Sequence, residues 1–368
     1  MTSDLRFMRR VLRLALRGAG RVSPNPLVGA LVARDGVVLA EGWHHAVGDD
    51  HAEIDALKKA GPAARGADLY VNLEPCCHFG RTPPCAPAVI AAGIRRVVIA
   101  HIDPNPLVAG QGVSMLRAAG LQVEVGVLED EAREVNAAFL TWITAGRPFV
   151  TLKMAMTLDG RTAARDGSSR WVSSEASRRQ VHRMRAVADA VMVGAGTALH
   201  DDPLLLPVLA RPRRRTLRVV VDEAAALPPG SRLATTTGRS PVLVAATDAA
   251  DPARVLALRA RGVEVLRLPA REGFVLPGTL LAELGQRGVG SVLAEGGPTL
   301  AASLLRAGLV DRLVLFVAPR LLGDPAAMPL VGDLGLRDLS AARPFDVAAV
   351  RRCGPDVRID LRPREPRS

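Results

Sequence analysis

The chain has few cysteines, few aromatic residues and almost no lysine. Four cysteines among 368 residues exclude a small secreted domain held together by several disulfides. Aromatic residues make up only 3% of the sequence, so few rings are present of the kind that single-stranded nucleic-acid binders use to stack bases. The core must therefore be built mainly from Val, Leu, Ala and Ile.

Lysine occurs at only three positions, Lys58, Lys59 and Lys153, and the other basic residues are arginine. The formal net charge is +11. We interpret this charge first as an arginine-rich solvated surface and second as attraction for phosphorylated small molecules. Nucleic acid is the third interpretation, which the scarcity of aromatic residues opposes.

Long uncharged apolar runs are also absent. No stretch approaches the roughly 20 residues that a membrane-spanning helix needs. Arginines interrupt the apolar positions of residues 1–20, which predicts an amphipathic first helix and not a signal peptide. An arginine-rich organellar presequence is the alternative, and Asp4 argues against it. We expect a cytoplasmic protein that does not bind membranes.

Two α/β domains are predicted, because the length suffices for two cores and short apolar strands alternate with helices throughout. In the first domain, residues 1–145, helices are expected over 51–61, 85–94, 111–120 and 129–146. A new alternation of strands and helices begins near "GRPFVTLK" and predicts a second domain over 149–363.

Three of the cysteines lie in "NLEPCCHFGRTPPC", residues 72–85, downstream of "DDHAEIDAL". His51 and Glu53 form a His-x-Glu pair at the start of a predicted helix. Zinc-dependent deaminases combine this pair with two cysteines at a second helix start, and their glutamate transfers protons and is not a ligand. We therefore predict that His51, Cys76 and Cys85 bind Zn²⁺, with a fourth position for water, and that Glu53 is the catalytic acid and base.

Cys77 and His78 are left out of this ligand set, because adjacent residues rarely turn toward the same ion. The alternative is a closed structural site with three cysteines and a histidine, in which zinc only stabilises the domain and Glu53 has no role. Eight residues separate Cys76 from Cys85, whereas nucleic-acid editing deaminases commonly have two. Arg81 and Thr82, within this insert, are candidate substrate contacts.

The second domain lacks a Gly-x-Gly-x-x-Gly after a strand, so a Rossmann dinucleotide site is not supported. In "SVLAEGGPTL" a strand ends near Glu295, and Pro298 suits the first position of a helix whose N–H groups would bind an anion. Lys153 is the only lysine of this domain. It is a candidate cation for a phosphate or a polarised substrate oxygen, and the alternative is a strand-edge surface charge.

An ordered series of segments resembles the bifunctional riboflavin biosynthesis deaminase-reductase family over nearly the whole chain. It includes "SPNPLVGALV", "EGWHHAVGDDHAEIDAL", "LYVNLEPCCHFGRTPPC", "AGIRRVVIAHIDPNP" and, further on, "TLKMAMTLDGRTAARDGSSRWVSS". The resemblance implies a cytidine-deaminase-like zinc domain followed by a dihydrofolate-reductase-like α/β domain that uses NADPH.

The implied reactions act on phosphoribosylated pyrimidines. The first is deamination of 2,5-diamino-6-(5-phosphoribosylamino)pyrimidin-4(3H)-one. The second reduces the ribosyl group of 5-amino-6-(5-phosphoribosylamino)uracil to a ribityl group. We also expect a homo-oligomer that does not bind nucleic acid.

The resemblance also implies site residues, some of which have a simpler structural interpretation. The NADPH site would include Ala155, Trp171, Thr197 and Asp201, with the run Gly297, Pro298, Thr299, Leu300, Ala301, Ala302 and Ser303. The substrates would contact Asn25, Ser169, Arg185, Leu205 and Glu295. The alternatives are a turn residue for Asn25, a solvated helix face for Arg185 and a cap for Asp201.

Two positions depart from the family pattern. Val208 stands where the family has an arginine on the substrate phosphate, so Arg211 or one of Arg213 to Arg215 is expected to replace it. Without a replacement, the reductase half would be weakened or degenerate beside an intact deaminase. After Asp222 the chain also lacks the serine found in the family, and that cofactor contact is not carried over.

Overall fold

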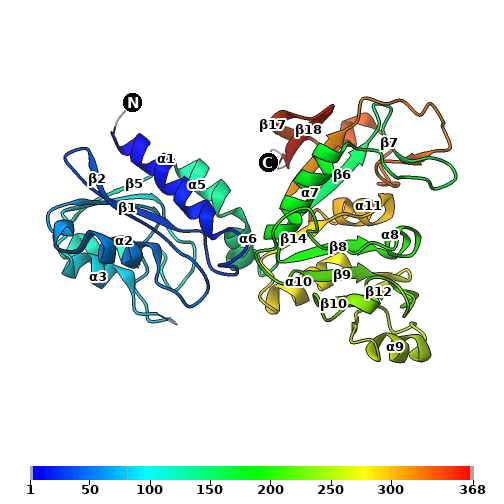
Figure 1. The fold of residues 1–368 in the computed structure, drawn as a ribbon, viewed down its shortest axis with the longest axis horizontal. Coiled ribbons are helices and arrows are strands. Elements are labelled where there is room, and N and C mark those ends of the chain that lie inside the picture. Colours follow the sequence, from blue (N-terminus) through cyan, green and yellow to red (C-terminus); the bar gives the residue numbers. More distant parts are fainter. Residues whose placement is uncertain (1–2, 81, 365–368) are drawn as a thin grey trace. The chain divides into compact units, whose positions relative to one another are not determined.

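A computed structural model describes residues 3–80 and 82–364. The chain divides into two compact units, Met1–Gly146 and Arg147–Ser368, which Figure 1 shows in blue to blue-green and in green to red. Among the described residues, no helix combines the length and apolar character required to cross a membrane.

The sheet of the first unit has the strand order β2-β1-β3-β4-β5. β1 runs antiparallel to β2 and β3, whereas β3, β4 and β5 are parallel. The strands of this unit are β1 (Gly29–Arg34), β2 (Val37–Trp43), β3 (Asp68–Leu73), β4 (Arg96–His101) and β5 (Gln122–Val125). Its helices are α1 (Ser3–Ala15), α2 (Ala52–Ala60), α3 (Cys85–Ala91), α4 (Gln111–Ala118), α5 (Glu129–Val135) and α6 (Ala137–Ala145), with 3₁₀ turns at Leu16–Gly18 and Gly61–Ala64.

Helices cover both faces of this sheet, because successive strand residues point to opposite sides. Leu31 packs with α1 and α5 on one face, and its neighbours Ala30 and Val32 pack with α2, α3 and α4 on the other. Figure 1 shows α1 and α5 on one side of the sheet and α2 and α3 on the opposite side. The arginine-interrupted N-terminal segment is the amphipathic helix that its pattern predicts, with Phe7 and Met8 buried.

The single helix predicted over 129–146 is wrong, because the segment forms two helices, α5 and α6, that meet at Asn136. The Asn136 side chain leaves the helical pattern to pair with a distant backbone. Its Oδ1 accepts a hydrogen bond from Leu27 N at 2.8 Å, and its Nδ2 donates to Leu27 O at 3.2 Å. A buried amide that satisfies a long-range backbone segment therefore overrides the local preference for one continuous helix.

The sheet of the second unit has the order β11-β10-β9-β8-β14-β6-β15-β18-β17. All neighbours are parallel except β15 with β18 and β18 with β17, which are antiparallel. Its strands are β6 (Phe149–Met156), β8 (Ala190–Gly194), β9 (Leu217–Val221), β10 (Val242–Ala246), β11 (Glu264–Arg267), β14 (Ser291–Ala294), β15 (Arg312–Val317), β17 (Phe345–Cys353) and β18 (Asp356–Pro363). Two small ribbons lie outside it, β12 (Ala270–Arg271) with β13 (Phe274–Val275), and β7 (Arg161–Ala163) with β16 (Met328–Pro329).

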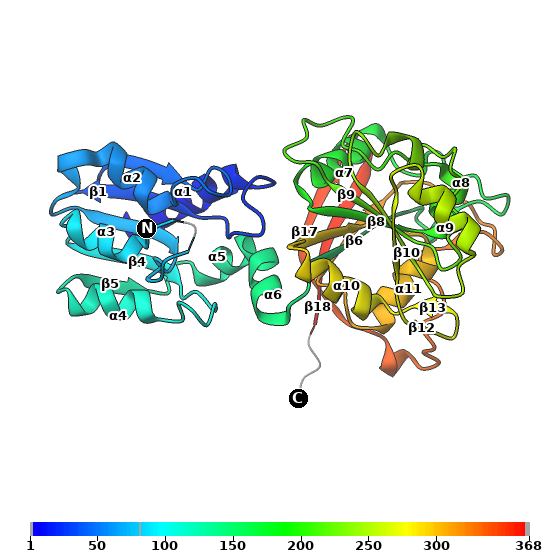
Figure 2. The same cartoon turned by 90° about the horizontal axis from the view of Figure 1, so that it is seen from below.

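Helices also cover both faces of this larger sheet, as Figure 2 lets the reader follow. One face packs against α10 and α11 through a core that includes Leu152, Met192 and Leu304. On the other face, α8 and α9 pack against Val193 and Val244, and α7 packs against Phe316. The helices are α7 (Glu175–Val187), α8 (Ala195–Asp201), α9 (Pro252–Arg259), α10 (Pro277–Gln286) and α11 (Pro298–Arg306), with 3₁₀ turns at Ala234–Thr236 and Leu339–Ala341.

Candidate active sites

Two helix starts bring the predicted zinc ligands of the first unit together. His51 is the residue before α2, and Cys85 is the first residue of α3. Cys76 lies in the loop that follows β3, where its sulfur accepts a hydrogen bond from Cys85 N at 3.3 Å. The His51 Nδ1 atom lies 3.5 Å from Cys76 Sγ and 3.3 Å from Cys85 Sγ. Within the described residues, these three form the one cluster of metal-binding side chains, with ligand atoms within 4.8 Å of one another.

This donor set fits a zinc ion. One imidazole and two thiols with converging ligand atoms match the nitrogen and sulfur ligands that zinc prefers, and three protein ligands are typical of catalytic sites. The His51 Nε2 atom lies 3.1 Å from Thr82 Oγ1, so the ring can keep its proton there and direct Nδ1 toward the metal. The Cys76 pKa is lowered, because its sulfur accepts a hydrogen bond from Cys85 and also pairs with His51.

Cys77 and His78 lie outside this cluster. The Cys77 thiol points to a different segment and donates to Leu107 O at 3.8 Å. A closed site with three cysteines and a histidine, the structural alternative, therefore finds no support in the described residues. Arg81, the first candidate substrate contact of the insert, lies outside the described residues.

Glu53 lies in the first turn of α2, two residues after His51, and only 3% of its surface is exposed. Burial, with the nearby Cys76 charge, raises the pKa of its carboxyl to about 7. A carboxyl group with this pKa can accept and return a proton near neutral pH, as a catalytic acid and base must.

The loop that carries Cys76 is held by Glu74, which sequence reasoning did not select. The buried Glu74 carboxylate accepts hydrogen bonds from Asp103 N at 3.2 Å, Gly110 N at 3.0 Å and Val113 N at 3.0 Å. A side chain at Gly112 would lie 2.1 Å from Pro75 O, so α4 can approach the loop this closely only with glycine there. The acidic residue beside the cysteines was visible in the sequence, but its partners lie 29 to 39 residues further along the chain.

Asn25 lies beside His44, which precedes α2 in the chain. Its Nδ2 atom is 3.1 Å from His44 Nε2, and His44 Nδ1 is 3.0 Å from Asp50 O. The His44 ring also meets the His51 ring edge to face, with centroids 5.4 Å apart. Asn25 is therefore connected to the zinc cluster through His44, a buried residue that the sequence analysis did not single out.

The second unit contains a cavity of about 990 Å³ at the carboxyl ends of its central strands. Lys153 and Ala155 reach it from β6, Gly194 from β8, Val221 from β9, and Glu295 follows β14. In open α/β sheets, ligands bind in the crevice at this edge of the strands. The cavity also receives the start of α11, where Gly297 is the cap and Pro298 the first residue.

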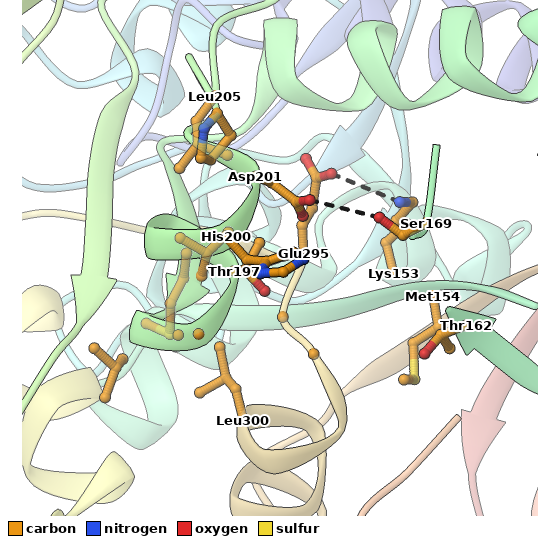
Figure 3. Close-up of a pocket in the computed structure, with 18 of the residues that line it drawn as sticks. Lys153, Met154, Thr162, Ser169, Thr197, His200, Asp201, Leu205, Glu295 and Leu300 are labelled. Carbon is orange, nitrogen blue, oxygen red and sulfur yellow. Dashed lines mark hydrogen bonds and ion pairs between the residues drawn. The ribbon is translucent and has the colours of Figure 1, made fainter. Parts of the chain in front are cut away.

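A buried carboxylate with two cations lies in this cavity. Glu295 pairs with Arg185 through two hydrogen bonds, at 2.5 Å from Nε and 2.9 Å from Nη2, and its Oε2 lies 3.7 Å from Lys153 Nζ. Burial disfavours the charged carboxylate, but Arg185 and Lys153 outweigh it and lower its pKa to about 2. The alternatives in which Lys153 is a strand-edge surface charge and Arg185 lies on a solvated helix face do not fit this arrangement, because both side chains are largely buried. Figure 3 shows Lys153 and Glu295 joined across the cavity.

Most of the predicted cofactor and substrate residues line the same cavity. These are Lys153, Ala155, Ser169, Trp171, Arg185, Thr197, Asp201, Leu205, Glu295, Gly297, Pro298, Thr299, Leu300 and Ser303. Ser169 Oγ donates to Asp201 Oδ1 at 3.5 Å, as Figure 3 shows. Ala301 and Ala302 do not line the cavity; both are buried. Only one face of a helix can meet a cavity, so a continuous run of seven residues cannot contribute throughout.

His182 also lines the cavity and was not predicted from the sequence. It lies one turn before Arg185 on α7, the spacing that places two helical residues on one face. That spacing was a usable signal, but only once Arg185 was known to face the cavity.

Val208 lies at the cavity and is 56% exposed. The arginines expected to replace its missing cation do not line the cavity. Arg214 pairs with the buried Asp189, and Arg215 donates to Gly238 O at 2.8 Å. Among the described residues, the Lys and Arg side chains that do line it are Lys153, Arg170, Arg178, Arg185 and Arg232.

The folds and sites define a zinc-dependent deaminase followed by a reductase. Residues 1–101 match the cytidine and deoxycytidylate deaminase zinc-binding region, and residues 148–359 match the RibD C-terminal domain. The second match covers more than half of the chain. The chain therefore belongs to the RibD family of riboflavin biosynthesis proteins, and its second domain has the dihydrofolate-reductase-like fold.

Full-length relatives support this membership. The chain is 41% identical over 356 residues to the riboflavin biosynthesis protein RibD of Aquifex aeolicus, covering 97% of each chain. It is 36% identical to Acinetobacter baumannii RibD, with a TM-score of 0.87 and 99% of each chain covered. A Thermotoga maritima diaminohydroxyphosphoribosylaminopyrimidine deaminase/5-amino-6-(5-phosphoribosylamino)uracil reductase is 36% identical, with a TM-score of 0.86 and 98% and 99% of the two chains covered. The chain is a bifunctional enzyme, and a nucleic-acid base deaminase is not favoured.

Proposed function

We propose that the chain catalyses the two reactions named for its Thermotoga relative. Residues 1–145 would deaminate 2,5-diamino-6-(5-phosphoribosylamino)pyrimidin-4(3H)-one, and residues 149–363 would reduce 5-amino-6-(5-phosphoribosylamino)uracil with NADPH. The observation that carries this proposal is the convergence of His51, Cys76 and Cys85 beside the buried Glu53, within a chain that also carries the second, charged cavity. The product of the first reaction is the substrate of the second, so one chain with both sites is chemically sensible.

In the deamination, His51, Cys76 and Cys85 would hold zinc, which when bound supplies Lewis-acid activation of water. Water adds to the ring carbon that bears the 2-amino group, ammonia leaves, and a carbonyl oxygen replaces it. Glu53 would accept the two protons of the water in turn, passing the first to the ring nitrogen and the second to the leaving amine. Asn25, tied to His44, would orient the pyrimidine, which is supported by its link to the zinc cluster.

In the reduction, NADPH when bound would supply one hydride to the ribosyl carbon attached to nitrogen, and one proton would complete the ribityl product. The start of α11, from Gly297, would hold the cofactor phosphates on its free N–H groups. The approach of Thr197 to this helix start supports the assignment, since a side chain on Gly297 would lie 3.6 Å from Thr197 Oγ1. Ala155, Trp171 and Asp201 would line the rest of the cofactor site.

The substrate would contact Lys153, Arg185 and Glu295, with Ser169 and Leu205 at the same cavity. Lys153 and Arg185 carry the charge that a phosphoribosyl group requires, and their shared partner Glu295 holds both in place. Because Val208 supplies no cation, a weakened reductase beside a normal deaminase is the second candidate function.

The pure zinc-loaded protein should be incubated with the diaminopyrimidine ribotide, with and without NADPH. We expect ammonia in both cases and NADPH oxidation with formation of the ribityl product when NADPH is present. Ammonia release without NADPH oxidation would favour the weakened reductase. Absence of both products would contradict the proposal.

The proposal extends to cellular context and assembly. We propose that the enzyme works in the cytoplasm as a homo-oligomer and does not act on nucleic acid. The proposed use of Cys76 and Cys85 as metal ligands and not as a disulfide supports the cytoplasmic part, since a reducing compartment keeps such neighbouring cysteines available for a metal. Size-exclusion chromatography with light scattering tests the oligomer, and a nucleic-acid binding assay tests the third part.

A further inference from the structure

An acidic side chain, Glu223, lies in the reductase cavity just beyond the carboxyl end of β9. Its backbone oxygen accepts hydrogen bonds from Thr247 N at 3.0 Å and Thr247 Oγ1 at 3.1 Å. Its Oε1 accepts one long hydrogen bond from Val275 N at 3.4 Å. Across the described residues, no Lys, Arg or His lies within ion-pair distance of this carboxylate. The backbone of Glu223 is therefore fixed by hydrogen bonds, whereas its carboxylate has no cationic partner among the described residues and is available to a ligand.

The strand order indicates which part of a dinucleotide would reach Glu223, if the proposed reductase function is correct. The reacting nicotinamide must lie beside the substrate, near Lys153 on β6 and Glu295 after β14. The pyrophosphate would lie on the start of α11, also after β14. Since the sheet continues β6-β14-β8-β9, the remaining adenosine half extends toward the end of β9.

The distances of the sheet agree with this placement. Neighbouring strands lie about 4.8 Å apart, so β6 and β9 are separated by roughly 15 Å, a span that an extended dinucleotide can bridge. An acidic residue at a strand end is also the element that binds adenosine ribose hydroxyls in other α/β dinucleotide sites, whereas an arginine there accommodates a 2′-phosphate.

Within the part of the chain that the structure describes, each arginine that lines the cavity has another hydrogen-bond or ion-pair partner. Arg185 pairs with Glu295, Arg170 donates to Asp201 O, Arg178 donates to Ser173 O and covers the Trp171 ring, and Arg232 Nη1 donates one long hydrogen bond to Asp202 O at 3.5 Å. Although the chain is rich in arginine, no cavity-lining arginine among the described residues therefore has a guanidinium group without another partner that could bind a 2′-phosphate beside Glu223.

We propose that Glu223 binds the adenosine ribose hydroxyls and removes the reductase's preference for a 2′-phosphate, so that NADH serves as well as NADPH. The carboxylate accepts hydrogen bonds from the 2′- and 3′-hydroxyls of NADH. Beside the 2′-phosphate of NADPH it places two negative charges close together, which selects against that ligand. Glu223 is thereby a specificity-determining residue of the cofactor site.

The test compares kcat/KM for NADH and NADPH with the deaminated ribotide as substrate. We expect the two values to lie within about tenfold of each other in the natural protein. Glu223→Ser is expected to raise the NADPH-to-NADH ratio by roughly ten- to a hundredfold, mainly through a lower KM for NADPH, because a like charge is removed. Glu272→Ser, on an exposed glutamate outside the cavity lining, is the matched control and should leave the ratio unchanged.

A strong preference of the natural protein for NADPH, or an unchanged ratio in Glu223→Ser, would overturn the inference while leaving the proposed function intact. Failure of both nucleotides to be oxidised would instead contradict the proposed function. In that case, titration with ADP-ribose and with its 2′-phosphate still tests Glu223. The natural protein should not bind the 2′-phosphate form more tightly than ADP-ribose, whereas the Glu223→Ser variant should bind the 2′-phosphate form more tightly.

Discussion

The two units each bury one functional glutamate, and the two carboxyl groups have opposite properties. Burial raises the pKa of Glu53 to about 7, and the charge of the neighbouring Cys76 adds to this effect more than His51 offsets it. Glu295 is equally withdrawn from water, yet Arg185 and Lys153 bring its pKa down to about 2. The comparison teaches that burial alone does not determine protonation; the sign of the neighbouring charge does. One glutamate is suited to moving protons, and the other to holding cations in place.

The largest expected effect concerns the metal cluster of the first unit. Cys85→Ser removes one of three ligands and should abolish stoichiometric zinc binding and ammonia release, because a hydroxyl is a poor ligand for this ion. NADPH oxidation with the deaminated ribotide should persist, since the second site contains no zinc ligand. Zinc is measured by elemental analysis of the purified protein.

Cys77→Ser is the matched control, because Cys77 is adjacent to a ligand but points toward Leu107 O. It should retain zinc and both activities. Zinc loss in this variant would mean that Cys77 completes the metal shell.

Glu53→Gln tests the glutamate beside the zinc cluster. The amide keeps the shape of the side chain but cannot carry the proton, so ammonia release should fall by roughly 10² to 10⁴ while zinc content stays at one equivalent. Reductase activity on the deaminated product serves as the internal control. Loss of zinc would identify Glu53 as a ligand instead.

Glu295→Gln tests the glutamate that has two cations. The change leaves the buried Arg185 and Lys153 without their anion, and we expect the second unit to lose about 3 to 5 kcal/mol of unfolding free energy at pH 7. Reduction should be lost and ammonia release retained. The exposed Glu175, which pairs with Arg179 on α7, is the control, and Glu175→Gln should cost less than about 0.5 kcal/mol.

The difference in unfolding free energy between the natural and Glu295→Gln proteins should decrease as the pH falls. Because the folded pKa of Glu295 lies below the ordinary value of 4.5, its contribution is fully present above pH 4.5. It declines as the pH falls toward about 2, where the folded carboxylate takes up a proton. Urea unfolding of the natural and Glu295→Gln proteins between pH 7 and pH 2.5 should give converging curves; parallel curves would contradict the assigned charge state.

The smallest expected effect concerns the orientation of His51. Thr82→Val removes the oxygen that lies 3.1 Å from His51 Nε2, and zinc affinity should fall by about tenfold. Competition with a chromophoric chelator measures the affinity. Thr82→Ser keeps the hydroxyl and should keep the affinity, whereas equal weakening in both variants would assign Thr82 a packing role.

Local patterns predicted much of the first unit. His51, Cys76 and Cys85 lie within 35 consecutive residues, and their chemistry is readable because each helix start presents one ligand type at a recognisable spacing. The amphipathic first helix is equally local, since a helix repeats every 3.6 residues. The division near residue 146 also follows the change of pattern in the sequence. By contrast, the break at Asn136 depends on Leu27, more than 100 residues earlier, and no local signal announces it.

By itself, the sequence determined the family, the zinc donor set and the alternation of strands and helices, because these depend on residue types and short spacings. Only the tertiary structure decided that Lys153, Arg185 and Glu295 form one charged group. It also decided that His182 lines their cavity and that Glu223 lies at the same edge of the sheet. Parallel strands that are neighbours in the sheet can be far apart along the chain, as β6 and β14 are. Contacts across such strands are set by the packing of the whole sheet and not by the segments that contribute them.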